Sequence, residues 1–369
     1  MDSFKKKKVL FLARFFAPPL GGGEFFIISV LKYLKEKGYS CMGVCYYDPE
    51  TNAQFKTEKL TEWQGIPVLQ TSIDRISKIQ ELYEDIEPDL VITQSYDAPI
   101  IVDVAKRMGI KTILGTHFWR NICAVNDNFV GMLDRPMDTV TLLKTYHRVF
   151  HEADEMYVNS KFMQKAVERY VGVNIERIIH PLVDVTRVLC SEKTDDYITI
   201  VNPDSGKGGD VFADIARKMP ERKFMSVGLA SEIIPENIKI NSKIKRLSNI
   251  KILEKTDNMK DIYAQTKILL IPSLVDETFS MVALEAMANG IPILSSSNGN
   301  LPFLVENGGF LLDTGDIDSW VDAIKELFSD TLSYNNISEN AKNNSHKYDS
   351  NIELNKFHEM VKLCIGESE

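Results

Sequence analysis

The sequence predicts an α/β protein of two domains, and three observations carry this prediction. The chain has 369 residues, which is long for one hydrophobic core and comfortable for two domains. Short apolar runs alternate with segments of helical periodicity, which is the pattern of a parallel sheet covered by helices. The first apolar run leads through a glycine-rich loop into a helix, as at the start of a doubly wound α/β domain.

Six strands are predicted in the first half of the chain, with helical patterns between most of them. The strands are Lys8–Phe15, Ser40–Tyr46, Ile66–Gln70, Leu90–Gln94, Lys111–Gly115 and Glu155–Asn159. The helices are Phe25–Lys37, which Gly38 closes, Ile76–Ile86 and Pro99–Met108. A further helix starts after Asn159. Residues 121–145 have weak periodicity and predict no regular element.

The second half repeats the alternation of strands and helices. Its predicted strands are Tyr197–Asn202, Lys223–Val227, Ile250–Leu253, Ile268–Pro272 and Ile291–Ser295. Its predicted helices are Val211–Met219, Met259–Gln265 with Asp257 as cap, Ser280–Asn289, Ser319–Phe328 and the amphipathic Tyr348–Cys364.

Composition and charge exclude several classes of protein. The chain is 44% hydrophobic and 26% charged, with a net charge of −9, which argues against a nucleic-acid binder. The basic run Lys5–Lys8 is interpreted as a solvated strand entry, with contact to anionic lipid as the alternative. Five scattered cysteines without a CxxC pair predict reduced thiols and no zinc site. No signal peptide is recognised, so we expect a cytoplasmic protein, with peripheral contact to the inner face of a membrane left open.

The stretch from Ile268 to Ser297 holds two carboxylates, Glu277 and Glu285, with seven residues between them. Glu277 lies in the predicted loop, and Glu285 lies in the second turn of an otherwise apolar helix. Because helical side chains lean toward the N-terminus, Glu285 is expected to reach back toward the loop of Glu277. Carboxylates suit hydroxyl groups and the free amides of a helix start suit an anion, so a phosphorylated sugar would use both.

This stretch resembles the Glu-seven-residues-Glu signature of the retaining GT-B glycosyltransferases, the group 1, family 4-like enzymes. Glu277-Thr278-Phe279-Ser280 stands where the family has an acid, Gly or Ser, Phe and Gly. The family's Leu-Glu-Ala-Met-Ala-x-Gly-x-Pro is intact from Leu284 to Pro292. The alternative is a plain strand–helix–strand crossover with an incidental surface Glu.

The resemblance implies roles for residues of this stretch. It also implies a role for the loop between the predicted strand Tyr197–Asn202 and the predicted helix Val211–Met219. Glu277 would act at the donor sugar as a catalytic residue, and Glu285 would hold the ribose. Lys207 of the Lys-Gly pair would grip the donor diphosphate, or else be an ordinary turn residue. The other substrate-binding positions are Phe279, Ser280, Met281 and Val282, the last three through backbone amides.

Three residues of the first half also match the family. Gly22 and Gly23, in the loop APPLGGGE, resemble its Gly-Gly loop beside the donor diphosphate or the acceptor. This loop has neither the Walker A nor the dinucleotide-binding spacing, and a plain tight turn is the alternative. His117 stands just past the end of a predicted strand, where the family has a His near the donor sugar; a merely packed His is the alternative.

The chain departs from the family at several positions. Asn202 occupies the place of an Arg that grips the diphosphate, and Asn lacks the cationic fork of Arg. Asn300 and Phe303 stand where the family has Gly and Glu. Asp316-Ile317-Asp318 spells DxD, the metal motif of another glycosyltransferase fold, but its place at a helix start predicts a cap.

As a whole, the resemblance implies two Rossmann-like domains that face each other across a cleft, residues 1–184 and 185–347. A C-terminal helix, residues 348–369, would return to the first domain, and residues 121–145 would form part of the acceptor wall.

The activity implied is transfer of a sugar from a nucleotide-diphosphate donor to a hydroxyl acceptor with retention, in glycan, glycolipid or glycoconjugate synthesis, including polysaccharide biosynthesis. No metal or other cofactor is expected. A nucleotide-sugar epimerase and a non-catalytic two-lobed nucleotide-sugar binding protein are the alternatives.

Overall fold

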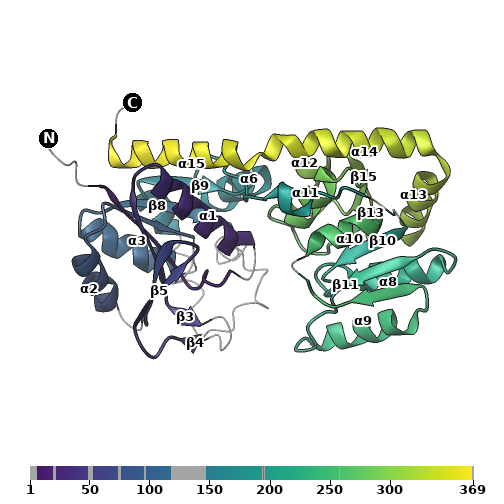
Figure 1. The fold of residues 1–369 in the computed structure, drawn as a ribbon, viewed down its shortest axis with the longest axis horizontal. Coiled ribbons are helices and arrows are strands. Elements are labelled where there is room, and N and C mark those ends of the chain that lie inside the picture. Colours follow the sequence, from purple (N-terminus) through teal and green to yellow (C-terminus); the bar gives the residue numbers. More distant parts are fainter. Residues whose placement is uncertain are drawn as a thin grey trace. The chain divides into compact units, whose positions relative to one another are not determined.

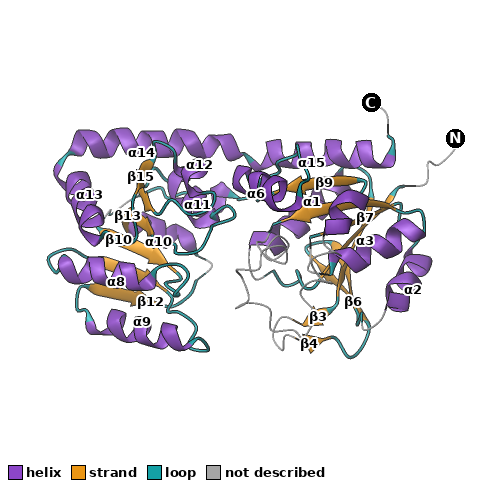
Figure 2. Cartoon of the chain, turned by 180° about the vertical axis from the view of Figure 1, so that it is seen from behind, coloured by secondary structure: helices purple, strands orange, loops and turns teal. Residues whose placement is uncertain are grey.

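Two compact units make up the chain. The computed structural model describes residues 6–19, 22–48, 53–73, 76–94, 97–117, 147–192, 194, 196–256 and 258–367. Unit 1 comprises Met1–Leu182 with Ser350–Glu369, and unit 2 comprises Val183–Asp349. Each unit holds one main sheet, and Figure 2 shows helices flanking the strands of both sheets. The predicted α/β class is therefore confirmed.

Unit 1 is built on a seven-stranded sheet in the order β5-β6-β2-β1-β7-β8-β9. All neighbouring strands are parallel except β5, which pairs antiparallel with β6 at the edge. The strands are β1 (Lys8–Ala13), β2 (Ser40–Cys45), β5 (Lys59–Trp63), β6 (Ile66–Gln70), β7 (Leu90–Thr93), β8 (Lys111–Thr116) and β9 (Glu155–Val158), with the short pair β3 (Tyr47–Asp48) and β4 (Ala53–Gln54) beside them. The helices are α1 (Gly22–Glu36), α2 (Ile76–Ile86), α3 (Ala98–Arg107), α6 (Lys161–Val171) and α15 (Ser350–Ile365).

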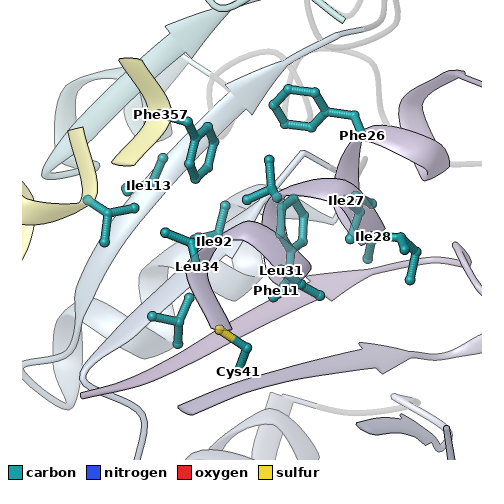
Figure 3. Close-up of a cluster of buried hydrophobic side chains, with 14 of the residues drawn as sticks. Phe11, Phe26, Ile27, Ile28, Leu31, Leu34, Cys41, Ile92, Ile113 and Phe357 are labelled. Atoms are coloured by element: carbon teal, nitrogen blue, oxygen red, sulfur yellow. The ribbon is translucent and has the colours of Figure 1, made fainter. Parts of the chain in front are cut away.

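Alternate residues of β1 serve two hydrophobic cores, one on each face of this sheet. Val9 and Phe11 pack with α1 and α15 on one face, whereas Leu10 and Leu12 pack with α2 and α3 on the other. A strand buried on both faces reads as a continuous apolar run, which is why the run at residues 8–15 was recognisable. Figure 3 shows Phe357 of α15 reaching into the first core toward Phe26 and Ile113.

The C-terminal helix α15 belongs to unit 1. Phe357 packs edge-on against Phe26 of α1, with ring centroids 5.7 Å apart. The fully buried Glu353 accepts a hydrogen bond from the backbone N–H of His180 at 2.9 Å. Figure 1 shows this helix, in yellow, running over α1 and β8. The chain therefore leaves unit 1 near Leu182 and re-enters it at Ser350.

Unit 2 contains a six-stranded, fully parallel sheet in the order β12-β11-β10-β13-β14-β15. The strands are β10 (Tyr197–Val201), β11 (Phe224–Val227), β12 (Ile250–Leu253), β13 (Thr266–Ile271), β14 (Ile293–Ser295) and β15 (Gly309–Leu311). The helices are α7 (Val185–Val188), α8 (Gly209–Lys218), α9 (Pro235–Arg246), α10 (Met259–Gln265), α11 (Met281–Ala288), α12 (Leu301–Val305), α13 (Ile317–Ser329) and α14 (Thr331–Ser345), with the 3₁₀ turn His346–Tyr348.

The strand order of unit 2 is that of a Rossmann fold, 3-2-1-4-5-6 counted from β10. The direction of strand addition reverses between β10 and β13, so the chain segments that follow these two strands diverge there. In open α/β sheets ligands bind outside the strand ends at this switch point. The loops after β10 and β13 carry Lys207 and Glu277, respectively.

Several elements escape prediction for physical reasons. The helix α9 has few apolar residues because it buries Asn237 and Asn241 together with Ile240 and Ile244, so its periodicity is weak. The three-residue strand β15 is too short to read as a strand. The helix α14 and the short α7, α12, β3, β4 and β5 were also not predicted. Asp257 and the whole of residues 121–145 lie outside the described residues.

Candidate functional site

The loop between β10 and α8 lies directly against the end of β13. A Cβ atom on Gly208, whose φ is +77°, would lie 1.9 Å from the carbonyl oxygen of Pro272. The carbonyl of Gly206 accepts hydrogen bonds from the N–H groups of Leu274 at 2.8 Å and Val275 at 3.3 Å. Only glycine permits such an approach of two backbones at this φ. The Lys-Gly pair recognised in the sequence thus joins two loops.

This approach places Lys207 beside Glu277. The Nζ atom of Lys207 lies 2.5 Å from Oε1 of Glu277, and the hydroxyl of Ser273 donates to the same oxygen at 2.7 Å. The Glu277 side chain is 9% exposed and that of Lys207 39%, so the carboxylate is buried and the ammonium still meets solvent. Burying a carboxylate is tolerated because a cation and a hydroxyl satisfy it.

The backbone of Glu277 is held as firmly as its side chain. Its carbonyl accepts from the N–H of Asn300 at 2.7 Å, and Glu277 forms an isolated parallel bridge with Gly299. A Cβ atom on Gly299, with φ +67°, would lie 2.2 Å from the Glu277 carbonyl oxygen. Asn300 stands at a position where the sequence departs from the family, and its backbone takes part in this anchor.

Helix α11 begins four residues after Glu277, with Ser280 as its N-cap in a left-handed conformation, φ +82°. The first amides of a helix, here including those of Met281 and Val282, have no acceptor within the helix and carry partial positive charge. Lys207, the carboxylate of Glu277 and the start of α11 therefore meet at the carboxyl ends of the strands of unit 2. Phe279 differs from its neighbours, since its side chain is 2% exposed and packs on Tyr348. A ligand could reach only its backbone.

Glu285, in the second turn of α11, has a different partner from Glu277. The hydroxyl of Tyr263, on α10, donates to its Oε2 at 2.7 Å. Burial raises the pKa of Glu285, and the hydrogen bond from Tyr263 acts in the opposite direction. The described hydrogen bonds give the two carboxylates no common partner, and the common pocket stays a prediction. Neither Tyr263 nor Ser273 was singled out from sequence; Ser273 had a signal, since it directly follows the β13 run.

A cavity of about 360 Å³ lies at the carboxyl ends of β10, β11 and β12. It is lined by Val201, Asn202, Val227, Lys255, Thr256 and Met259. Asn202 has φ +54°, a left-handed conformation that asparagine tolerates better than arginine. Its side-chain amide donates to Asp204 at 3.4 Å. The residue at the family's Arg position therefore borders a cavity without bringing a charge to it.

In unit 1 the sequence-predicted residues also gather at strand ends. His117 follows β8, is 4% exposed, and lies with Nε2 3.1 Å from the Tyr157 hydroxyl. Gly22 and Gly23 form the start of α1, and the carbonyl of Gly23 accepts from the side chain of Gln94, which follows β7. In the sheet β7 lies between β1 and β8, so the segments that follow these three strands are neighbours.

The DxD residues have structural partners. Asp316 is the N-cap of α13 and accepts from the N–H of Ser319 at 3.2 Å, which confirms the predicted cap. Asp318 pairs with Lys218 at 2.5 Å on the surface. None of the helices in the described ranges offers an apolar stretch of the length that a membrane span requires.

The sequence matches two family profiles, one in each half. The profile described as Glycosyltransferase Family 4 matches residues 20–187, and that described as Glycosyl transferases group 1 matches residues 210–344. D-inositol 3-phosphate glycosyltransferase of Mycolicibacterium smegmatis is 25% identical over 206 residues, which are 49% of this chain and 46% of the relative. N-acetyl-alpha-D-glucosaminyl L-malate synthase of Bacillus anthracis is 31% identical over 113 residues, 29% of each chain. The chain spans less than half the length of these relatives.

Solved structures resemble the chain over nearly its full length. Sucrose-phosphate synthase from Thermosynechococcus elongatus has a TM-score of 0.80 at 15% identity, covering 98% of this chain and 100% of its own. Anabaena HepE in complex with UDP has a TM-score of 0.77 at 18% identity, covering 96% and 99%. These likenesses confirm the predicted fold class, two Rossmann-like domains of the GT-B type.

Proposed function

Because this chain belongs to the group 1 glycosyltransferases, we propose that it transfers a sugar from a nucleoside-diphosphate donor to a hydroxyl acceptor, with retention at the anomeric carbon. The observation that carries the proposal is the Lys207–Glu277 pair at the switch point of unit 2. It joins a half-exposed cation to a buried carboxylate directly before the start of α11. HepE, of the same fold, has been solved with UDP and with UDP-glucose.

The two halves of this pair suit the two ends of such a donor. We assign Lys207 and the amides at the start of α11 to the diphosphate, since an ammonium and free helix amides stabilise an anion. Their charge matters most when the bond from the anomeric carbon to the phosphate oxygen breaks and the diphosphate departs. We assign Glu277 to hydroxyls of the donor sugar, because a carboxylate accepts hydrogen bonds.

The nucleoside is assigned to the region around the cavity of unit 2. The cavity, with its apolar residues Val201, Val227 and Met259, suits a planar base. Glu285 is assigned to the ribose: Tyr263 uses Oε2, and Oε1 is the oxygen proposed for the ribose hydroxyls. Asn202 offers no cation, so in this proposal Lys207 and the α11 amides carry the diphosphate charge alone.

Retention is proposed to follow a front-face course. The acceptor oxygen forms its bond to the anomeric carbon on the face that the diphosphate leaves, and the departing phosphate oxygen takes the acceptor's proton. Glu277 is held by Lys207 and Ser273 and is assigned no nucleophilic role. We also propose that transfer needs no divalent metal ion, because Asp316 and Asp318 already serve as a cap and a surface pair.

The direct experiment incubates the protein with UDP-, ADP- and GDP-sugars, with and without a panel of hydroxyl acceptors. We expect one nucleoside diphosphate to be released only when an acceptor is present, the anomeric configuration to be kept, and the rate to survive excess EDTA. Donor conversion without acceptor would indicate an epimerase, and binding without turnover a non-catalytic binding protein. Either result would overturn the proposal, and loss of activity in EDTA would overturn its metal-free part.

A further inference from the structure

A chain of hydrogen bonds runs from the first turn of α1 across three strand ends to His117. The Nε2 atom of Gln94 donates to the carbonyl of Gly23 at 2.9 Å, and the hydroxyl of Tyr157 donates to Oε1 of Gln94 at 3.2 Å. Nε2 of His117 lies 3.1 Å from that hydroxyl. All three side chains are buried, with 3%, 0% and 4% of their surface exposed for Gln94, Tyr157 and His117.

The direction of every bond in this chain follows from its first acceptor. The Gly23 carbonyl can only accept, so the amide nitrogen of Gln94 faces it and the amide oxygen faces Tyr157. The single hydroxyl proton of Tyr157 is therefore used on Gln94. The Tyr157 oxygen can then only accept from His117, which places the imidazole proton on Nε2 and leaves the lone pair on Nδ1.

The surroundings keep the ring neutral and fixed. Burial lowers the pKa of His117 to about 3. The ring of Phe26 packs on His117 with centroids 4.7 Å apart and on Tyr157 at 5.8 Å. Gly115 makes room for the phenol, since a Cβ atom there would lie 2.4 Å from the Tyr157 hydroxyl oxygen. The site is thus built around the position of this hydroxyl.

We propose that Tyr157 and Gln94 are positioning residues that hold His117 as its Nε2–H tautomer, so that Nδ1 accepts a hydrogen bond from a substrate hydroxyl. A neutral lone pair repels phosphate and carboxylate oxygens and attracts a hydroxyl proton, so the group recognised is a sugar or acceptor hydroxyl. That substrate assignment rests on the proposed function; the tautomer does not. The carbonyl of Gly23 also has a role, because it sets which group donates and which accepts in every hydrogen bond from Gln94 to His117.

The tautomer can be read without substrate from long-range ¹H–¹⁵N correlation spectra of ¹⁵N-histidine-labelled protein, with His117→Gln to assign the resonance. We expect the wild-type ring to carry its proton on Nε2. Tyr157→Phe should give a mixture of tautomers. Gln94→Leu should shift the ring toward Nδ1–H, because the freed Tyr157 hydroxyl can then donate to Nε2.

The matched control is Tyr83→Phe, which removes a hydroxyl from an equally buried tyrosine that donates to the carbonyl of Ile101 at 3.2 Å. It should leave the His117 spectrum unchanged at a similar cost in thermal stability. A wild-type proton on Nδ1, or a His117 spectrum unaltered in both Tyr157→Phe and Gln94→Leu, would overturn the inference.

The kinetic experiment uses the donor and acceptor that the wild-type protein turns over. Tyr157→Phe and Gln94→Leu should lower kcat at least tenfold with a smaller change in the donor KM, and Tyr83→Phe should lower neither. Normal kcat with a changed tautomer would refute the functional half of the proposal. If the wild type transfers no sugar, the proposed function fails, and the spectra still decide whether Tyr157 and Gln94 set the tautomer.

Discussion

Two residues at the site hold left-handed backbones without being glycine. Asn202 has φ +54° after β10, and Ser280 has φ +82° at the start of α11. For residues with a side chain such conformations cost about 1–2 kcal/mol, and asparagine bears the cost most easily. Backbone strain of this kind persists where the surrounding structure imposes it, often at functional sites. Both residues flank the switch point of unit 2, where the donor diphosphate is assigned.

Glu285 provides the test of the ribose assignment at the scale of one side chain. Glu285→Gln keeps an acceptor for the Tyr263 hydroxyl but removes the charge offered to the ribose. We expect it to weaken binding of the nucleoside diphosphate that the wild type prefers by about 1–3 kcal/mol, measured by titration calorimetry. Glu326→Gln is the control, because Glu326, on the exposed face of α13, also accepts from a hydroxyl, that of Ser333 at 3.0 Å. Equal affinity for folded Glu285→Gln and wild type would refute the ribose role.

At the scale of elements, the close approach of the β10–α8 loop to β13 is what creates the site. Gly208→Ala should destabilise unit 2 in urea unfolding, both through its positive φ and through the contact with Pro272. Gly172→Ala isolates the first effect, because Gly172 has the same φ of +77° and nothing within 4 Å of an added Cβ. We expect about 1–2 kcal/mol for Gly172→Ala and a further 1–3 kcal/mol for Gly208→Ala. Equal losses of stability in the two variants would mean that the β10–α8 loop can move away from Pro272 at no energetic cost.

The attachment of α15 to unit 1 should depend on pH. Burial would raise the pKa of Glu353, but hydrogen bonds from His180 and Lys356 lower it below its ordinary value. A lowered acid pKa gives stability that is fully present above the unfolded pKa of about 4.3 and is lost as the pH falls through the folded pKa. Glu353→Gln should therefore cost about 1–3 kcal/mol at pH 7 and progressively less below pH 4.

Urea unfolding of wild type and Glu353→Gln, at pH 7 and again below pH 4, measures how the cost of the substitution changes with pH. The control is Glu359→Gln, which removes an exposed carboxylate of the same helix that forms a surface ion pair with Lys362 at 2.8 Å. It should leave the stability close to that of wild type, because an ion pair between exposed side chains contributes little. A loss in Glu353→Gln that does not shrink in acid would show that the charge of Glu353 does not stabilise its contacts with His180 and Lys356.

At the scale of the whole molecule, the sequence predicts those parts in which local pattern and burial agree. The central strands β1, β7, β10 and β13 are mostly apolar because both of their faces are covered. Helix α10 is predicted with the bounds Met259–Gln265 that it has. Helix α9 could not be predicted, because two of its buried positions are asparagines and the apolar periodicity is weak. Asn241 forms hydrogen bonds with both the N–H and the carbonyl of Ala230, at 3.0 and 2.9 Å.

The candidate site was predictable in its parts and not in its contacts. Glu277 and Lys207 stand out by motif, but they lie 70 positions apart, and only the approach of Gly208 to Pro272 shows that they pair. Tyr157 and Gln94 carry no sequence signal at all. Each is an ordinary strand-end residue until the fold places it beside His117.

The central claim is that Lys207, held against Glu277, binds the diphosphate of a nucleotide sugar. Calorimetric titration of UDP, ADP and GDP into wild type, Lys207→Ala and Lys218→Ala tests it most directly. Lys218 is the matched control, since it also pairs with a carboxylate, Asp318, at 2.5 Å but on the surface. We predict that one nucleoside diphosphate binds wild type and Lys218→Ala equally, and Lys207→Ala at least tenfold more weakly, with all three proteins folded. Equal affinity for Lys207→Ala and wild type would contradict the claim. So would a wild-type protein that binds none of the three nucleotides UDP, ADP and GDP.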